Sequence, residues 1–505
     1  MKKVFFTVWI AIFVVCACTP LFAQKVEQVE KAEREIEKEK ALREKIEEKK
    51  KPELQKPLLP PAPAVKFPET KILIANIDVI GVTLIPAGEI NNIITGYKNK
   101  ELTMAEMQKV ADLITDVYRK KGLVTSRAYL VPQKIEAGRL EIRVVEGMTG
   151  DIEIKGNRYF KVKLIRNMIV LKKGEPFDYE ILRKGLSKIN EQPDRNAKAV
   201  IVPGKEPGTT DVVLEMKDNL PIHIGFDWDN FGSRYIGKDR YSIKFTHNNL
   251  LGFDDKLFFQ YQLGQASRYY LKSIRYLIPA GANWELGISA SLSRIKLGQE
   301  LEDTDSRGKS QIYSFFTNRR LIDKENFDLA MTLGFDYKDI INYQLQAVSS
   351  HDRIRLVKMG LDMDAADNLG RTIISNEFDV GLPNIMGGLD EQDSRSSRNG
   401  AGGKFIKDTI NLLRLQKMPF SSTLLWKNQM QLSPNILTAA EQFQIGGISN
   451  VRGYPPAEVV GDRGYAMTWE WSMPPYFVPR DIKVPFSKAK LYDALRLVTF
   501  YDWAT

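Results

Sequence analysis

Residues 220–505 are dominated by segments in which apolar and polar residues alternate with a period of two. The clearest of these segments are 222–229, 241–246, 284–293, 328–337 and 466–473. A single alternating strand also suits a soluble sheet, but here many segments of about ten residues carry ionisable residues on one face and aromatic residues near their ends. That combination is typical of transmembrane barrels, which face lipid outside and water inside. We therefore predict an antiparallel transmembrane β-barrel over 220–505, with an exported β-sandwich array or propeller as the alternative.

The strand count in this region bears on the end of the chain. About thirteen strand candidates lie between Pro221 and Thr505, although Ile354–Met363 and Ile406–Leu415 alternate poorly. Bacterial single-chain barrels have an even number of strands, and an open sheet edge is not viable in lipid. The last candidate, Leu497–Trp503, runs into the end of the sequence. We therefore expect the chain to be truncated at its C-terminus.

Two smaller α+β units precede the predicted barrel, and both have the order strand, helix, helix, strand, strand. In the first unit, 70–147, the elements are Ile72–Val79, a helix around Ile90–Tyr97, a helix that begins at a capping box of Thr103 and Glu106, Ala128–Val131 and Leu140–Val145. In the second unit, 148–219, they are Asp151–Lys155, Val162–Leu171, Tyr179–Asn190, Ala197–Pro203 and Asp211–Met216. The sequence thus predicts two tandem copies of one unit.

The first 23 residues predict export. A cationic start is followed by the apolar run Val4–Ala17, and the small residue Ala23 precedes polar Gln24. We predict a signal peptide over 1–23 that is cleaved near Ala23, which removes both cysteines of the chain, Cys16 and Cys18. An uncleaved anchor and lipid attachment at Cys18 are the alternatives.

A charged helix and a stiff linker follow the signal peptide. Residues 25–51 hold ten basic and nine acidic residues with few apolar ones, which favours a solvated helix over 24–51 or, as the sharper alternative, a plug or partner-binding helix. Six prolines between Pro52 and Pro68 predict an extended linker over 52–69.

Composition argues against nucleic-acid binding and against catalysis. The net charge of +10 is thinly spread, and no basic run with interleaved aromatic residues appears. Three histidines and no cysteine after position 18 leave little material for a metal site or a nucleophile. The stretch Asn399–Lys404 resembles a phosphate loop, but no Ser or Thr follows Lys404, so we expect a flexible barrel loop. We predict no enzyme, cofactor, metal or nucleotide.

Two acidic pairs have the spacing of possible acid/base or calcium sites. They are Asp227 with Asp229 and Asp362 with Asp364, each two residues apart on a strand candidate. We expect their side chains to line water in the lumen.

Several motifs resemble a known family. The segments Leu130–Gln133, Gly138–Ile142 and Val145–Gly147 of the first unit, and Ile189–Pro193 and Val202–Gly204 of the second, resemble polypeptide-transport-associated (POTRA) domains. The tetrad Val451, Arg452, Gly453 and Tyr454 resembles the motif of the long loop that folds back into the lumen of the ShlB/FhaC/HecB two-partner secretion transporters. The resemblance extends over most of the chain from about Thr70 onward.

The resemblance implies a fold and a site. It implies two periplasmic POTRA domains before a barrel of sixteen strands in the parent protein. In such proteins the loop arginine meets an aspartate on a strand beginning Phe-Tyr-Asp, which fits Phe500–Asp502, although Trp503–Ala504 stands where the family usually has a glycine. A buried arginine needs a charged partner, so a pair of Arg452 with Asp502 would pin the loop. Without the resemblance, Arg452 would equally be an ordinary loop arginine.

The resemblance also implies a function. An outer-membrane translocator would capture an unfolded exoprotein, of adhesin or cytolysin type, through the periplasmic units and secrete it through the barrel. It would work as a monomer in outer-membrane lipid, and the helix over 24–51 resembles the family's plug helix. The alternatives are a barrel-assembly or insertion factor, which usually has three or more POTRA units, and a passive porin, which would leave the tandem units unexplained.

Overall fold

The computed structural model describes residues 28, 29, 31, 43, 70–281, 283–324, 326–485 and 489–505. The predicted signal peptide and linker lie outside these residues, and the four described residues of the predicted helix over 24–51 are helical. The described chain forms two compact units, 70–221 and 222–505, and the second unit includes the four N-terminal residues. No helix in this part of the chain is long and apolar enough to cross a membrane.

The first half of the unit 70–221 is an α+β fold, as predicted. Its elements are β1 (Ile72–Ile74), β2 (Asn76–Ile80), α2 (Ala87–Ile94), η1 (Thr95–Tyr97), β3 (Lys100–Leu102), α3 (Met104–Lys120), β4 (Arg127–Leu130) and β5 (Arg139–Val145). The sheet order is β2-β5-β4, in which β5 is parallel to β2 and antiparallel to β4. The capping box of Thr103 and Glu106 is confirmed at the start of α3. Because the sheet and α3 both bury apolar faces, the core lies between them.

One strand of this half was predicted wrongly. The single strand Ile72–Val79 is broken at Ala75, whose backbone N–H donates to the carbonyl of Gly138 at 2.8 Å. The break lets β1 pair with β3 while β2 pairs with β5. The first piece is wholly apolar and the second carries Asn76 and Asp78 between apolar residues; both patterns suit a strand, so periodicity alone could not reveal the change of partner.

The second half repeats this fold. Its elements are β6 (Met148–Lys155), α4 (Val162–Arg166), α5 (Tyr179–Asn190), β7 (Arg195–Pro203) and β8 (Thr209–Asp218), in the sheet order β6-β8-β7. The helix predicted to end at Leu171 ends at Arg166, whose guanidinium donates to the carbonyls of Ile169 and Leu171. Those bonds hold the segment after α4 in a non-helical course.

Equivalent glycines show how closely the two halves correspond. Gly81 follows β2 and Gly156 follows β6, with φ of 91° and 84°. A Cβ at either position would lie 2.4 Å from a backbone oxygen, that of Val144 or that of Met216. Only glycine adopts this conformation and this closeness without strain, so the same turn is built twice.

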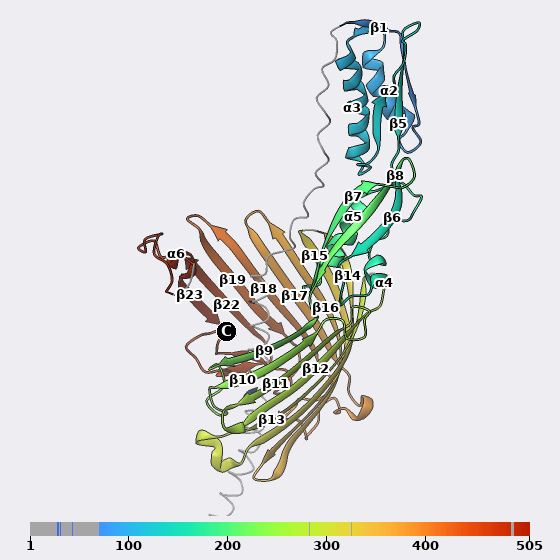
Figure 1. The fold of residues 1–505 in the computed structure, drawn as a ribbon. Helices are drawn as coiled ribbons and strands as arrows, with labels where there is room; N and C mark the ends of the chain where they lie inside the picture. The colour runs from blue at the N-terminus through green and yellow to red at the C-terminus, as the bar shows by residue number, and fades with distance from the viewer. Residues whose placement is uncertain are drawn as a thin grey trace, which may run out of the picture. The chain divides into compact units, whose positions relative to one another are not determined.

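Residues 222–505 form one antiparallel sheet of thirteen described strands (Figure 1), which confirms the antiparallel strands predicted for this region. The strands are β9 (Ile222–Asp229), β10 (Arg240–His247), β11 (Lys256–Gly264), β12 (Tyr269–Pro279), β13 (Trp284–Lys296), β14 (Arg307–Lys324), β15 (Phe327–Gln344), β16 (Ala347–Asp367), β17 (Gly370–Gly381), β18 (Ile406–Met418), β19 (Ser422–Leu432), β22 (Gly464–Met473) and β23 (Leu497–Ala504). Neighbours in sequence are neighbours in the sheet, and β9 and β23 are its end strands.

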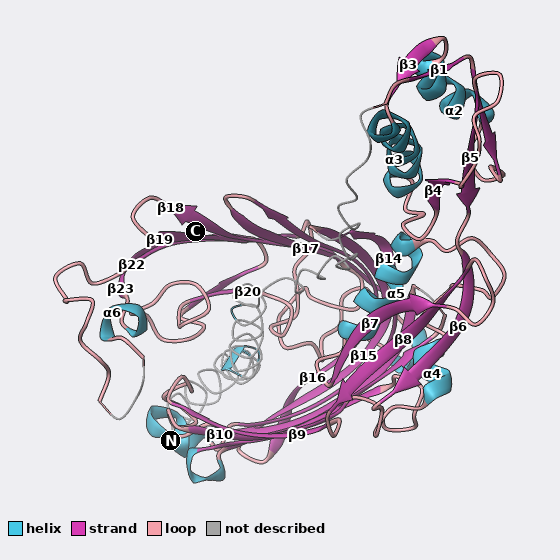
Figure 2. Ribbon diagram, turned by 45° about the horizontal axis from the view of Figure 1, so that its top comes forward, coloured by secondary structure: helices cyan, strands magenta, loops and turns pink. Residues whose placement is uncertain are grey.

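The sheet curves round an interior (Figure 2). The side chains on its two faces differ in exposure. The outer face exposes large apolar side chains, such as Phe226, Ile288 and Phe315. The inner face carries buried apolar residues, such as Ile295, and buried charged residues, such as Lys407. A short hairpin of β20 (Phe443–Ile445) and β21 (Val459–Gly461) lies inside the curve.

Strand direction sorts the connections between the two ends of the sheet. Because neighbouring strands are antiparallel, the connections 230–239, 265–268, 297–306, 345–346, 382–405 and 433–463 lie at one end. The described residues of the connections 248–255, 280–283, 325–326, 368–369, 419–421 and 474–496 lie at the other end, and the last of these connections includes α6 (Leu491–Ala494). The first strand, β9, begins at this second end.

Candidate functional site: the inner loop

The connection 433–463 between β19 and β22, here called the inner loop, carries the tetrad singled out in the sequence. Its Arg452 contacts Asp502 on β23 through three hydrogen bonds: the backbone N–H and Nε to Oδ2, at 3.0 and 2.8 Å, and Nη2 to Oδ1, at 2.8 Å. The Asp502 side chain is 4% exposed. The structure thus brings together the two residues that the resemblance implied as partners.

Arg452 has two further partners that sequence reasoning missed. Its Nη1 donates to Oε2 of Glu470 on β22 at 2.7 Å, and its guanidinium carbon lies 3.6 Å from the ring centroid of Phe500. Two carboxylates and an aromatic face therefore surround one cation, an arrangement that suits the planar guanidinium better than a lysine ammonium. Glu470 lies between two tryptophans, on the polar face of an alternating strand. That position is the sequence feature that could have pointed to a carboxylate facing the interior.

The other members of the tetrad shape the backbone. Gly453 has φ of 92° with open space where a Cβ would be, so the turn needs glycine for its backbone conformation and not for room. Val451 donates its N–H to Oδ1 of Asn450 at 2.8 Å, and Tyr454 is exposed while its carbonyl accepts from Gly447. Neither Val451 nor Tyr454 contacts Asp502 through a hydrogen bond in the described structure.

A second anchor of the inner loop is a buried charge cluster around Glu441. This carboxylate, 3% exposed, accepts from Lys338 of β15 at 2.6 Å and from Lys407 of β18 at 2.5 Å. Lys407 also contacts Asp379 of β17 at 3.0 Å. Two lysines and two carboxylates from four segments therefore neutralise one another, which is the condition under which charges tolerate burial.

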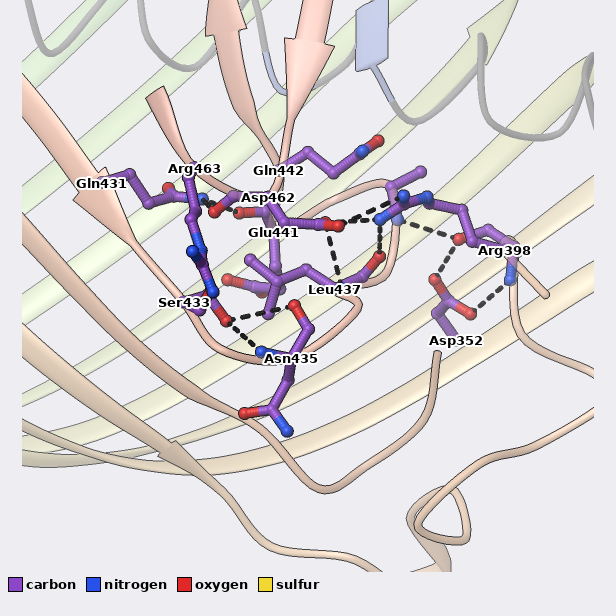
Figure 3. A network of polar contacts seen from close by, with 12 residues as sticks. Asp352, Arg398, Gln431, Ser433, Asn435, Leu437, Glu441, Gln442, Asp462 and Arg463 are labelled. Atoms are coloured by element: carbon purple, nitrogen blue, oxygen red, sulfur yellow. Dashed lines mark hydrogen bonds and ion pairs between the residues drawn. The ribbon is translucent and has the colours of Figure 1, made fainter. Parts of the chain in front are cut away.

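A third anchor joins the inner loop to the connection 382–405 (Figure 3). The guanidinium of Arg398 donates to the carbonyl of Leu437 and to Oδ1 of Asp462, the latter at 2.5 Å. Ser397, beside it, accepts at its hydroxyl from the backbone N–H of Ala439 at 3.0 Å. The two connections thus form one packed layer.

The segment Asn399–Lys404 is a loop between β17 and β18, as predicted, but it is packed against the rest of the connection 382–405 and was not expected to be. Ala401 is fully buried and its N–H donates to the carbonyl of Arg398 at 3.2 Å, while Lys404 pairs with Glu391 at 2.8 Å. The glycines here serve close packing, because a Cβ on Gly402 would lie 2.2 Å from the Glu391 carbonyl oxygen.

The four described residues of the N-terminal segment contact the same interior. Val29 is 1% exposed in an apolar cluster with residues of β12 and β13. The carbonyl of Gln28 accepts from Nε2 of Gln444 at 2.9 Å, and Lys31 donates to the carbonyl of Gln442. Arg43 approaches Glu470, the partner of Arg452, at 3.4 Å.

The acidic pairs at 227/229 and 362/364 are not free to act together. Each acid has a partner on a neighbouring strand: Asp227 with Lys244 at 2.8 Å, Asp229 with Arg240 at 2.7 Å, Asp364 with Arg371 at 2.7 Å and Asp362 with Ser375 at 2.6 Å. They are cross-strand pairs of the sheet.

In the first α+β unit, Glu146 explains the motif Val145–Gly147. Its carboxylate accepts from the backbone N–H groups of Thr83 and Leu84, both at 2.8 Å, from the Thr83 hydroxyl, and from the Tyr118 hydroxyl at 2.7 Å. Burial alone would raise the pKa of Glu146, but these hydrogen bonds outweigh it and lower the pKa below its usual value. Burial and the bond to Glu146 raise the pKa of Tyr118. The carboxylate thus braces α3 against the loop after β2.

Comparison with known families decides what these parts belong to. The model of the haemolysin secretion/activation protein family ShlB/FhaC/HecB matches residues 208–490, more than half of the chain, and that of the ShlB-type POTRA domain matches residues 72–147. The chain belongs to the ShlB/FhaC/HecB family. It is an outer-membrane transporter that secretes exoproteins by two-partner secretion, and it has a POTRA domain in the periplasm. It is not an enzyme.

Individual members of the family are distant in sequence. The heme/hemopexin transporter protein HuxB of Haemophilus influenzae is 24% identical over 87% of this chain and 76% of its own length. The outer membrane transporter CdiB of Dickeya dadantii is 24% identical over 75% of this chain and 69% of its own. The solved structure of CdiB from Escherichia coli, 20% identical, superposes with a TM-score of 0.64 over 91% of this chain and 85% of that one. That likeness shows a shared fold.

Proposed function

We propose that the periplasmic α+β units capture an unfolded exoprotein. The exoprotein then passes along the inner face of the sheet after the inner loop has moved. The supporting observation is the seat of Arg452, whose guanidinium is bound by Asp502 and Glu470 and stacked on Phe500. An obstruction held by ion pairs within a polar interior exchanges its partners for water more readily than one held by apolar packing. The inner loop therefore suits a removable plug.

The same proposal extends to the closure of the barrel and to the role of the N-terminal segment. We expect a closed barrel of sixteen strands in the parent protein, acting as a monomer surrounded by outer-membrane lipid. The residues at 24–51 serve as a second obstruction, a role that the contacts of Val29 and Arg43 support. The exoprotein is of the adhesin or cytolysin type, in line with the haemolysin secretion of the family.

Planar-bilayer conductance of the full-length protein tests the plug. We expect small, flickering channels for the wild type and wider or less stable ones for Arg452→Ala, because Asp502 loses its cation and Glu470 keeps only the longer contact with Arg43. Arg234→Ala is the matched control, since Arg234 is an exposed arginine in another connection at the same end of the sheet. Secretion of the partner exoprotein is measured in parallel.

Two outcomes favour the alternatives. Large, steady channels that do not respond to Arg452→Ala indicate a passive porin and refute the plug. Altered assembly of other outer-membrane proteins, with exoprotein secretion unchanged, indicates an assembly or insertion factor.

A further inference from the structure

Cations gather on the outer face of the sheet where β13 and β14 reach the connection 297–306. Four of them form a cluster, here called the basic quartet: Arg294, Lys296, Arg307 and Lys309. The register places Arg294 directly opposite Lys309, and Lys296 directly opposite Arg307. Residues opposite one another in an antiparallel pair have Cβ atoms about 5 Å apart, so two like-charged pairs stand side by side.

The outer face is identified by the residues between the cations. Ser293 and Ile295 are 4% and 2% exposed, and Ile295 packs on Val29 inside the curve. Because side chains alternate along a strand, Arg294 and Lys296 point the other way, as do Leu292 and the exposed Ile288 further down the strand. The quartet therefore stands on the face that meets lipid in an outer-membrane protein.

The quartet lies at the extracellular end of this face. Strand β9 follows the periplasmic units directly in the chain, so its first residue marks the periplasmic end of the sheet. Strand β13 is the fifth strand and runs in the same direction as β9, so Lys296 at its end is extracellular. Four residues below Lys309 on β14 stands Tyr313, whose ring meets that of Tyr337 at 6.1 Å. Such aromatic pairs mark the level of the lipid headgroups.

One carboxylate, Asp305, serves two members of the quartet and offsets one of its four charges. Asp305 pairs with Arg307 at 2.5 Å and lies 3.7 Å from Lys296. In the described part of the chain Arg294 and Lys309 have no carboxylate partner, and Arg294 faces the ring of Tyr270 at 5.9 Å.

Two features beside the quartet point the same way. The nearest outward carboxylate on β15, Asp339, stands opposite Gln311 and pairs with His351 at 2.8 Å. A fifth cation, Lys272, also lies over the ring of Tyr270, at 5.8 Å from its centroid. Like charges placed opposite one another destabilise a sheet unless an anion lies between them.

We propose that the basic quartet binds the phosphate groups of lipopolysaccharide in the outer leaflet. The lipid A headgroup carries phosphates on a glucosamine disaccharide, at the depth where the quartet stands above the tyrosines. Arginine and lysine are the residues that bind phosphate oxygens, arginine through two parallel donors. Lipopolysaccharide bound here would hold β13 and β14 together, and β13 contacts the N-terminal segment through Ile295.

Native mass spectrometry of the full-length protein in lipopolysaccharide-free detergent tests the site. The probe is lipid A with its inner Kdo sugars, titrated beside the same lipid without phosphates and beside phosphatidylglycerol. At about fivefold for each cation removed, the double variant Arg294→Gln/Lys309→Gln should bind the phosphorylated probe about 25-fold more weakly. The affinity of the wild type for the dephosphorylated lipid should be as low as, or lower than, the affinity of the double variant for the phosphorylated probe.

Arg319→Gln is the matched control. Arg319 is an outward arginine of the same hairpin that also stacks on an aromatic ring, that of Trp284 at 5.0 Å, but it lies at the periplasmic end. The affinity of the Arg319→Gln variant for lipid A should stay within about twofold of that of the wild type. Equal affinity of the wild type for phosphatidylglycerol and lipid A would overturn the proposal, as would wild-type affinity in the double variant.

Thermal unfolding without lipid gives a second readout. Because the double variant removes a like-charge pair, its unfolding midpoint in detergent should equal or exceed that of the wild type. A lower midpoint would contradict the inference that these charges lack an anion in the protein alone.

Discussion

The charge cluster around Glu441 allows a quantitative prediction about the inner loop. Replacing Glu441 by glutamine keeps the volume of the side chain but removes the anion that binds Lys338 and Lys407. Breaking a buried ion pair by removing one partner costs about 3–5 kcal/mol. Lys407 retains Asp379 at 3.0 Å, so the lower end of that range applies. At about 1.4 kcal/mol per factor of ten, the inner loop should leave its seat about 150-fold more often.

Labelling of a buried cysteine measures this directly. The predicted mature chain lacks cysteine, and Ala439 in the inner loop is fully buried, so a maleimide reaches Ala439→Cys only when the loop moves. We expect the labelling rate in the Glu441→Gln background to rise about 150-fold over the same cysteine in the wild-type background.

The control for this experiment is Glu458→Gln, the same substitution at an exposed position of the same loop. It should change the labelling rate by less than about threefold, since surface charges contribute little. If Glu441→Gln labels no faster than Glu458→Gln, the buried cluster does not hold the loop and the reasoning is refuted.

Three further predictions concern the other braces of the molecule. Glu146→Gln should speed hydrogen exchange of the amides at Thr83 and Leu84 near neutral pH. Because the pKa of Glu146 is lowered in the folded protein, the difference in exchange rate between variant and wild type should shrink as the pH falls below about 4.5 and through that lowered pKa. A difference in exchange rate that does not depend on pH would contradict this prediction. Gly453→Ala should lower stability by about 1–2 kcal/mol, from its φ alone, and Gly81→Ala by more, because a Cβ there meets a carbonyl oxygen at 2.4 Å; denaturant unfolding that ranks them the other way would be inconsistent with the geometry. Arg398→Ala should make the connection 382–405 sensitive to protease, and an unchanged digestion pattern would show that its other contacts suffice.

The fold was largely predictable because the helix caps and the hydrophobic periodicity of each segment favour the same element that the segment forms in the whole structure. The capping box at Thr103, the i, i+3, i+4 pattern of α3 and the period of two after Asp218 each specify one element without help from distant residues. Even the weakly alternating segments at Ile354–Met363 and Ile406–Leu415 entered the sheet, as parts of β16 and β18. The first of these segments alternates poorly because its inner face also carries apolar residues: Ile354 and Leu356 are buried in one cluster with Phe405 and Leu437 of the packed connections.

The site was predictable only in part. The juxtaposition of Arg452 and Asp502 followed from a family resemblance, since fifty residues separate them and no local pattern joins them. The role of that juxtaposition in secretion stays a prediction. The partners Glu470 and Glu441 were missed because an acid on a polar strand face or in a loop looks the same whether it meets water or a buried cation.

The inner loop is held by its three ionic anchors and by one small apolar contact, in which Leu437 packs with Ile354, Leu356 and Phe405. Glu441, Arg452 and Asp462 attach it to different parts of the interior: strands β15 and β18, strands β22 and β23, and the connection 382–405. Each attachment is ionic, so each loses strength when water enters beside it. A chain that brings its own polar backbone into this interior offers replacement partners at every anchor, whereas apolar packing would have to be exposed all at once. We infer that seating by separate ion pairs is what makes the loop both stable at rest and displaceable in steps.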